Sequence, residues 1–175
     1  MGLSFLFACA GCVSRFYKSA DARRAKIYTG LLDGMKGSMM AQAKGTFVFS
    51  AWDEKTWDGK DHKEIKGAKL THAKINNTFT GDIEGTSELQ YVMFYDDEGK
   101  AVYHGMEKIT GTLGGKKGSF VMHTEGRFDG KTAGGDWEIL PGSGTDELKG
   151  ITGTGSFEAQ LHENNTPYTL EYEVG

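Results

Sequence analysis

Proline and cysteine are both scarce in this chain. Only two of its 175 residues are proline and two are cysteine, whereas 26 are glycine. Both cysteines, Cys9 and Cys12, lie near the start, so no disulfide framework stabilises the rest of the chain and nothing there indicates an oxidising compartment. Scarce proline and abundant glycine, with many Thr, Val, Phe and Tyr residues, favour a sheet protein rich in turns.

Long hydrophobic runs are missing as well. The apolar run from Leu3 to Val13 is too short to span a bilayer, and no positive charge precedes it as a secretory signal would require. The chain has a net charge of −4. Residues 1–40 carry a net charge of +4, so residues 41–175 carry a net charge of −8. This acidic body argues against nucleic acid as a partner.

Residues 1–40 are expected to lie outside the folded domain. They are interpreted as a disordered leader, a targeting segment, or sequence upstream of a true start at Met39 or Met40. The expected location is cytoplasmic, with export or organelle targeting as the alternative if the leader is genuine. Residues 41–175 carry one consistent pattern and are predicted to form one domain.

Alternating apolar and polar residues predict eight strands after residue 40. They are expected at 45–52, 68–80 and 85–96, three times within 101–140, from 151, and at 168–174. The polar segment 53–67 is interpreted as a loop long enough to cover one end of the sheet. Long strands, short turns and small inward residues favour a closed antiparallel up-and-down barrel, with a β-sandwich as the alternative.

Turn geometry predicts which inward residues are neighbours. Two-residue turns at Gly114-Gly115 and Asp129-Gly130 would pair Glu107 with Met122 and Met122 with Trp137. A three-residue turn at 97–99 pairs Leu89 with Glu107, and a turn at Asp82 sets Asn77 beside Leu89. The predicted row across five strands is Asn77, Leu89, Glu107, Met122 and Trp137.

Glu107 is the residue in this row that suggests chemistry. An unpaired charge directed inward among aromatic residues is costly, so Glu107 is a candidate acid or base whose pKa is raised by desolvation, or an anchor for a ligand's polar end. A structural carboxylate bonded to Asn77, a tyrosine or a buried water explains it equally well. The candidate ligand-binding residues are Asn77, Leu89, Tyr91, Tyr103, Phe120, Met122, Thr124 and Trp137.

The interior could be hollow or filled. Inward glycines such as Gly105 and Gly135 favour a cavity because they remove side-chain volume, whereas small barrels are often packed solid. No metal or cofactor is predicted. Two histidines and two carboxylates on the outer face are better explained by cross-strand charge pairing, His104 with Glu125 and His123 with Asp136. Apolar Val102, Met106 and Val121 on that face could seat another subunit.

Several short segments resemble a bacterial domain-of-unknown-function family across residues 41–175. They are Gly45-Thr-Phe47, Phe79 to Gly85, Gly105 to Gly111, Gly118-Ser-Phe120 and Pro141 to Leu148. The resemblance implies an eight-stranded barrel of the same broad type as plant allene oxide cyclases and some bacterial spirocyclising enzymes, which close rings in shape-determined cavities. It implies no assigned activity. Family members often carry histidine where this chain has Thr124, so no acid-base role is transferred to that position.

Three hypotheses follow. The leading one is a barrel that binds a small, largely apolar molecule in a cavity centred on Glu107, Trp137, Tyr91 and Asn77. The second is a cyclase or isomerase in which Glu107 moves a proton. The third is a packed barrel that acts through its surface as a homo-oligomer or interaction module.

Overall fold

The computed structural model describes residues 40–175, which form one compact unit. The predictions for the leader, including the apolar run and the two cysteines, lie outside the described residues. Within residues 40–175, no helix combines the length and the apolar character needed to cross a membrane.

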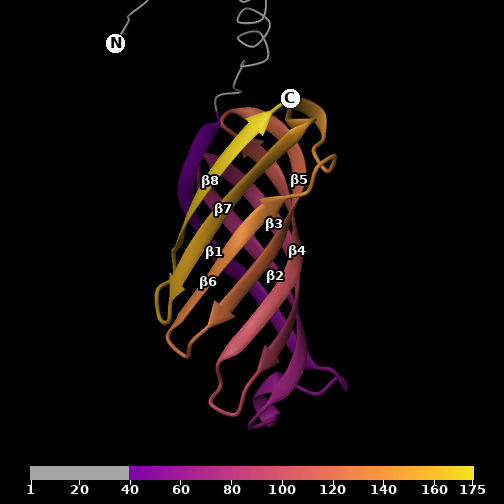
Figure 1. The fold of residues 1–175 in the computed structure, drawn as a ribbon, viewed down its shortest axis with the longest axis vertical. Helices are drawn as coiled ribbons and strands as arrows, with labels where there is room; N and C mark the ends of the chain where they lie inside the picture. The colour runs from indigo at the N-terminus through magenta and orange to yellow at the C-terminus, as the bar shows by residue number, and fades with distance from the viewer. Residues whose placement is uncertain (1–39) are drawn as a thin grey trace, which may run out of the picture. The chain divides into compact units, whose positions relative to one another are not determined.

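Eight antiparallel strands close into a barrel in the order in which they follow one another along the chain (Figure 1). The last strand pairs with the first, so the predicted barrel is confirmed and the β-sandwich alternative is wrong. The closer likeness to allene oxide cyclases stays a prediction. The strands are β1 (Ala41–Thr56), β2 (Lys69–Gly81), β3 (Ile83–Tyr95), β4 (Ala101–Leu113), β5 (Lys116–Phe128), β6 (Thr132–Ile139), β7 (Ile151–Gln160) and β8 (Thr166–Val174).

The first strand is longer than predicted and contains a bulge. Its pairing with β2 shifts between Phe49 and Ala51, because one extra residue in a strand leaves two residues opposite one. Beyond the bulge the inward face changes parity, so Ala51 is exposed and Glu54 is buried. The prediction that a loop begins at residue 53 is therefore wrong, because β1 continues to Thr56.

Strand register is partly as predicted. Leu89 pairs with Glu107 and Glu107 with Met122, as expected. Asn77 pairs with Ser87 instead of Leu89. The β2–β3 turn is held by Asp82, whose carboxylate accepts a hydrogen bond from the Lys44 N–H at 2.8 Å and whose N–H donates to the Lys44 carbonyl at 2.9 Å.

The β5–β6 turn moves the sixth strand by two residues. Asp129 donates its N–H to the Thr132 carbonyl at 3.1 Å, and its carboxylate accepts from the N–H groups of Lys131 and Thr132 at 2.8 Å. The tip is therefore one residue later than predicted. Trp137 consequently pairs with Thr124, and Met122 pairs with Ile139. A shift of two residues keeps every side chain on its predicted face but changes its neighbours.

One end of the barrel is packed solid. The β6–β7 connection contains the short 3₁₀ helix η2 (Asp146–Leu148), and Leu148 inserts into the main apolar cluster with 1% of its surface exposed. Hydroxyl groups fix this connection to β5, since Ser143 accepts from the Val121 N–H at 3.0 Å and Thr145 accepts from the Ser119 N–H at 2.9 Å. A second, smaller apolar cluster occupies the opposite half of the barrel.

Candidate functional site

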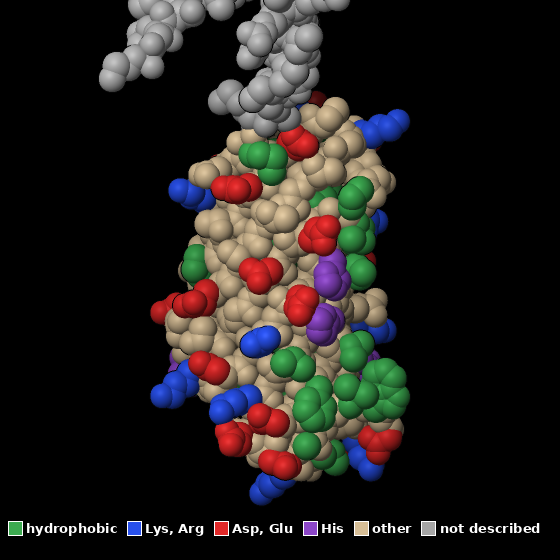
Figure 2. Space-filling model, viewed as in Figure 1, with side chains coloured by type: hydrophobic (Ala, Val, Ile, Leu, Met, Phe, Trp, Pro, Cys, Tyr) green, Lys and Arg blue, Asp and Glu red, His purple; other side chains and the backbone are tan. Residues whose placement is uncertain are grey.

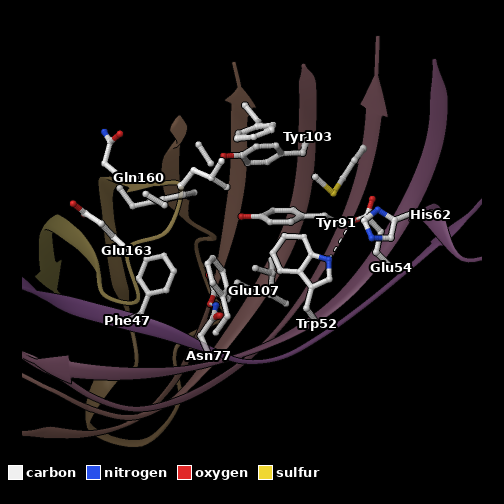
Figure 3. A pocket seen from close by; sticks show the side chains of 18 of the residues that line it. Phe47, Trp52, Glu54, His62, Asn77, Tyr91, Tyr103, Glu107, Gln160 and Glu163 are labelled. Carbon is white, nitrogen blue, oxygen red and sulfur yellow. Dashed lines mark hydrogen bonds and ion pairs between the residues drawn. The ribbon is translucent and has the colours of Figure 1, made fainter. Parts of the chain in front are cut away.

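A cavity of about 340 Å³ lies in the half of the barrel opposite η2 (Figure 3). The β1–β2 and β7–β8 connections contribute side chains to it, which shows that the cavity reaches this end of the barrel. Its size is near the lower limit for small-molecule sites. The lining residues are Phe47, Phe49, Trp52, Glu54, His62, Asn77, Leu89, Tyr91, Met93, Tyr95, Tyr103, Glu107, Phe128, Ala133, Trp137, Phe157, Ala159, Gln160, Leu161, His162 and Glu163.

Glu107 lies in the cavity wall with 1% of its surface exposed. Asn77 donates its amide N–H to Glu107 Oε1 at 2.7 Å, and the Ser87 hydroxyl donates to the same oxygen. Burial raises the pKa of Glu107, and these two hydrogen bonds oppose the rise. Since Oε1 accepts both bonds, the neutral acid carries its proton on Oε2 and can donate it to a further group.

Two other buried polar atoms in the cavity wall lack partners. Within residues 40–175, Asn77 Oδ1 and Trp137 Nε1 make no hydrogen bond, although both residues line the cavity. An unsatisfied buried donor or acceptor costs about 1–3 kcal/mol. Both atoms are themselves buried, so neither is presented directly to the cavity.

Two tyrosines form one wall, and glycines on the neighbouring strand make room for them. The rings of Tyr91 and Tyr103 lie 4.8 Å apart between centroids (Figure 3). A Cβ at Gly105 would lie 2.4 Å from the Tyr91 ring, and one at Gly126 would lie 2.3 Å from the Tyr103 ring. The interpretation that Gly105 leaves empty volume is therefore wrong, because a ring fills the space and lies close against the sheet.

Glu54 and His62 form a second polar group in the cavity that the sequence interpretation missed. Glu54 is 4% exposed. Its Oε1 accepts from the Thr71 hydroxyl at 2.7 Å, and its Oε2 accepts from Trp52 Nε1 at 3.0 Å and from the Tyr95 hydroxyl at 3.4 Å.

The imidazole of His62 completes this group. Its Nδ1 lies 3.3 Å from Glu54 Oε2. His62 begins the short 3₁₀ helix η1 (His62–Glu64) in the β1–β2 connection. One sequence signal could have identified Glu54, namely its alternation with Trp52 and Thr56. The bulge at Ser50 brings Glu54 and Thr56 of this series to the buried face.

The predicted site residues divide between the cavity and the packed core. Asn77, Leu89, Tyr91, Tyr103, Glu107 and Trp137 line the cavity. Phe120, Met122 and Thr124 are buried but do not line it. Phe120 and Met122 belong to the main apolar cluster.

The outer face carries an apolar patch and a pair of histidines (Figure 2). Val102 and Met106 are exposed there as expected, together with Leu70, Val92 and Phe94; Val121 is only half-exposed. Such a patch is compatible with an additional subunit, and oligomerisation stays a prediction.

The outer histidines are only partly arranged as predicted. His104 pairs with Glu125 as predicted, but His123 pairs with Glu138, because the sixth strand is shifted by two residues. Among residues 40–175, no group of three metal-ligating side chains is arranged to hold an ion.

Comparison with known protein families assigns this chain to a family. The model of a family described as protein of unknown function (DUF3224) matches residues 43–172. The chain belongs to the DUF3224 family. This confirms the resemblance found in the short segments of the sequence.

A solved structure from the DUF3224 family has the same fold. It is a protein of unknown function from Shewanella oneidensis MR-1, with a TM-score of 0.60 and 23% sequence identity, covering 78% of this chain and 98% of that chain. At this identity the likeness shows the barrel fold alone. No curated protein matches the chain. The chemistry of the cavity is therefore argued from this chain's own residues.

Proposed function

We propose that the protein binds a small, largely apolar molecule whose carbonyl oxygen accepts a hydrogen bond from Glu107. The observation that carries this proposal is a buried carboxyl in an aromatic cavity with one oxygen, Oε2, outside its two intramolecular hydrogen bonds. Burial raises the pKa of Glu107 and so favours the neutral, donating form.

The apolar character of the ligand follows from the remaining wall. Leu89, Met93 and Phe157 line the cavity beside the tyrosines. Burying an apolar molecule against such a surface contributes roughly 25 cal/mol per Å² of apolar area removed from water. The hydrogen bond to Glu107 then orients the molecule, since a buried polar group left without a partner is costly.

A matched pair of probes tests this function. Acetylnaphthalene carries a carbonyl oxygen, and ethylnaphthalene has nearly the same shape without it. We expect both to bind the full chain, followed by calorimetry or tryptophan fluorescence, with the ketone about 3- to 10-fold tighter because of one hydrogen bond. If neither compound binds, the proposed function is wrong.

Variants of Glu107 connect the preference to the carboxyl. Glu107→Gln keeps an N–H donor near the place of Oε2, so the preference for the ketone should persist. Glu107→Leu removes the donor and should bind both probes equally. A ketone preference that survives Glu107→Leu would assign the hydrogen bond to another group.

A second candidate function is proton transfer by Glu107 in an isomerase or cyclase. The raised pKa of this buried carboxyl favours it, because a general acid or base works best with a pKa near the working pH. For any substrate found, Glu107→Gln should lower turnover about 100-fold or more while binding stays within a few-fold. Equal turnover in the variant would exclude this role.

A further inference from the structure

We propose that the Glu54–His62 pair forms a second polar subsite that accepts a hydrogen bond from a ligand hydroxyl at the opposite end of the cavity from Glu107. This inference rests on the proposed function. It narrows the ligand class to a molecule with an apolar centre, an acceptor oxygen at one end and a hydroxyl or phenol at the other.

The two polar groups are separated by aromatic side chains. In the view of Figure 3, the rings of Trp52 and Tyr91 lie between the Glu107–Asn77 pair and the Glu54–His62 pair. All of these residues line the same cavity. A ligand long enough to reach both ends would therefore contact polar groups at its ends and aromatic carbon along its middle.

Glu54 positions His62 and leaves only one ring nitrogen for a ligand. The oxygens of Glu54 already accept from the Thr71 hydroxyl, the Trp52 indole and the Tyr95 hydroxyl. At 3.3 Å from Oε2, a proton on His62 Nδ1 is attracted by the carboxylate, whereas a lone pair there would be repelled. The neutral ring therefore carries its proton on Nδ1 and presents Nε2 as an acceptor.

The segment that carries His62 is tied to the barrel. The ammonium group of Lys69, at the start of β2, donates to the main-chain oxygens of His62 at 2.8 Å and of Ile65 at 2.9 Å. It also lies 5.2 Å from the centre of the Tyr95 ring. Across the cavity the β7–β8 connection contributes His162 and Glu163. A fixed acceptor is the arrangement that a directional hydrogen bond to a ligand requires.

The simpler explanation is that the pair only holds the β1–β2 connection in place, and two variants separate the explanations. His62→Asn keeps an N–H donor near the position of Nδ1 but removes the acceptor at Nε2. His62→Gln keeps an amide near the position of Nε2 and loses the group that faces Glu54.

The experiment compares acetylnaphthalene with its analogue that carries a hydroxyl on the far ring. In the unmodified protein the hydroxyl should tighten binding about 3- to 10-fold. His62→Asn should abolish this gain, and His62→Gln should keep part of it. The gain is taken within each variant as the ratio of the two affinities, so a general change in affinity does not enter it.

Each result has a distinct meaning. If the hydroxyl brings no gain in the unmodified protein although both ketones bind, the subsite is wrong and the proposed function stands. A gain that persists in His62→Asn likewise overturns the subsite, because the hydroxyl then bonds elsewhere. If neither ketone binds, the proposed function fails, and the subsite fails with it.

Discussion

The buried carboxyl of Glu107 should make stability depend on pH in a way that one substitution removes. Burial raises the pKa of Glu107 above the ordinary glutamate value of 4.5. In the window between that value and the raised pKa, the folded protein binds a proton that the unfolded chain has released. The free energy of unfolding therefore falls as pH rises through this window, and it is constant above it with respect to this group.

The size of the effect follows from proton linkage. One proton bound only in the folded state changes the free energy of unfolding by about 1.4 kcal/mol per pH unit. Glu107→Gln removes the ionisation and keeps the shape and one oxygen for the bonds from Asn77 and Ser87. The variant should match the unmodified protein at about pH 4 and exceed it in stability at neutral pH.

Urea unfolding at a series of pH values, followed by circular dichroism, measures this difference. Glu88→Gln is the matched control, because Glu88 is exposed on the outer face of β3 opposite Lys108. The control should show no comparable rise with pH. A difference between Glu107→Gln and the unmodified protein that is flat or falls between about pH 4 and neutrality would refute the raised pKa and the burial behind it.

Two further predictions concern the wall and the closed end of the cavity. Gly105→Ala should destabilise the fold by about 1–3 kcal/mol and weaken acetylnaphthalene binding, because the new Cβ would lie 2.2 Å from the Gln90 carbonyl oxygen and 2.4 Å from the Tyr91 ring. At Gly134 the nearest atom to a new Cβ would be 3.6 Å away, so Gly134→Ala should change neither quantity in the same urea and titration assays. Leu148→Ala should lower the free energy of unfolding in urea by about 2–5 kcal/mol. It should leave the affinity for acetylnaphthalene unchanged, since Leu148 lies in the packed cluster. A large loss of affinity would mean that packing at the η2 end affects binding in the cavity.

The barrel could be predicted because its central strands follow strict rules. From β2 to β5 the inward residues alternate without interruption, and the turns at Gly99 and at Gly114-Gly115 have positive φ as their sequences suggested. The registers of the β2–β3 and β5–β6 pairs, whose turns contain an aspartate, were predicted wrongly by two residues. Asp82 and Asp129 bind backbone N–H groups with their carboxylates, which moves the turn relative to the glycine beside it.

The second polar group of the cavity could not be predicted for a related reason. Glu54 lies in a charged segment after a strand that pattern alone would end at Trp52. The bulge at Ser50 directs Glu54 inward. No glycine or proline at this position indicates a bulge in the sequence. When the bulge is not predicted, no partner is predicted for His62, and His62 is interpreted as one polar residue of a surface loop.

The contrast between the two halves of one barrel is the strongest argument that the cavity has a function. At the η2 end the inward positions are apolar and Leu148 completes a packed core. At the other end Glu54, Asn77 and Glu107 occupy inward positions, where apolar residues of similar volume would often be at least as stable. Their hydrogen bonds satisfy part of each group, yet Asn77 Oδ1 stays without a partner within residues 40–175. A fold under selection for stability alone would gain by filling this half as it fills the other, so these polar residues support the ligand-binding proposal.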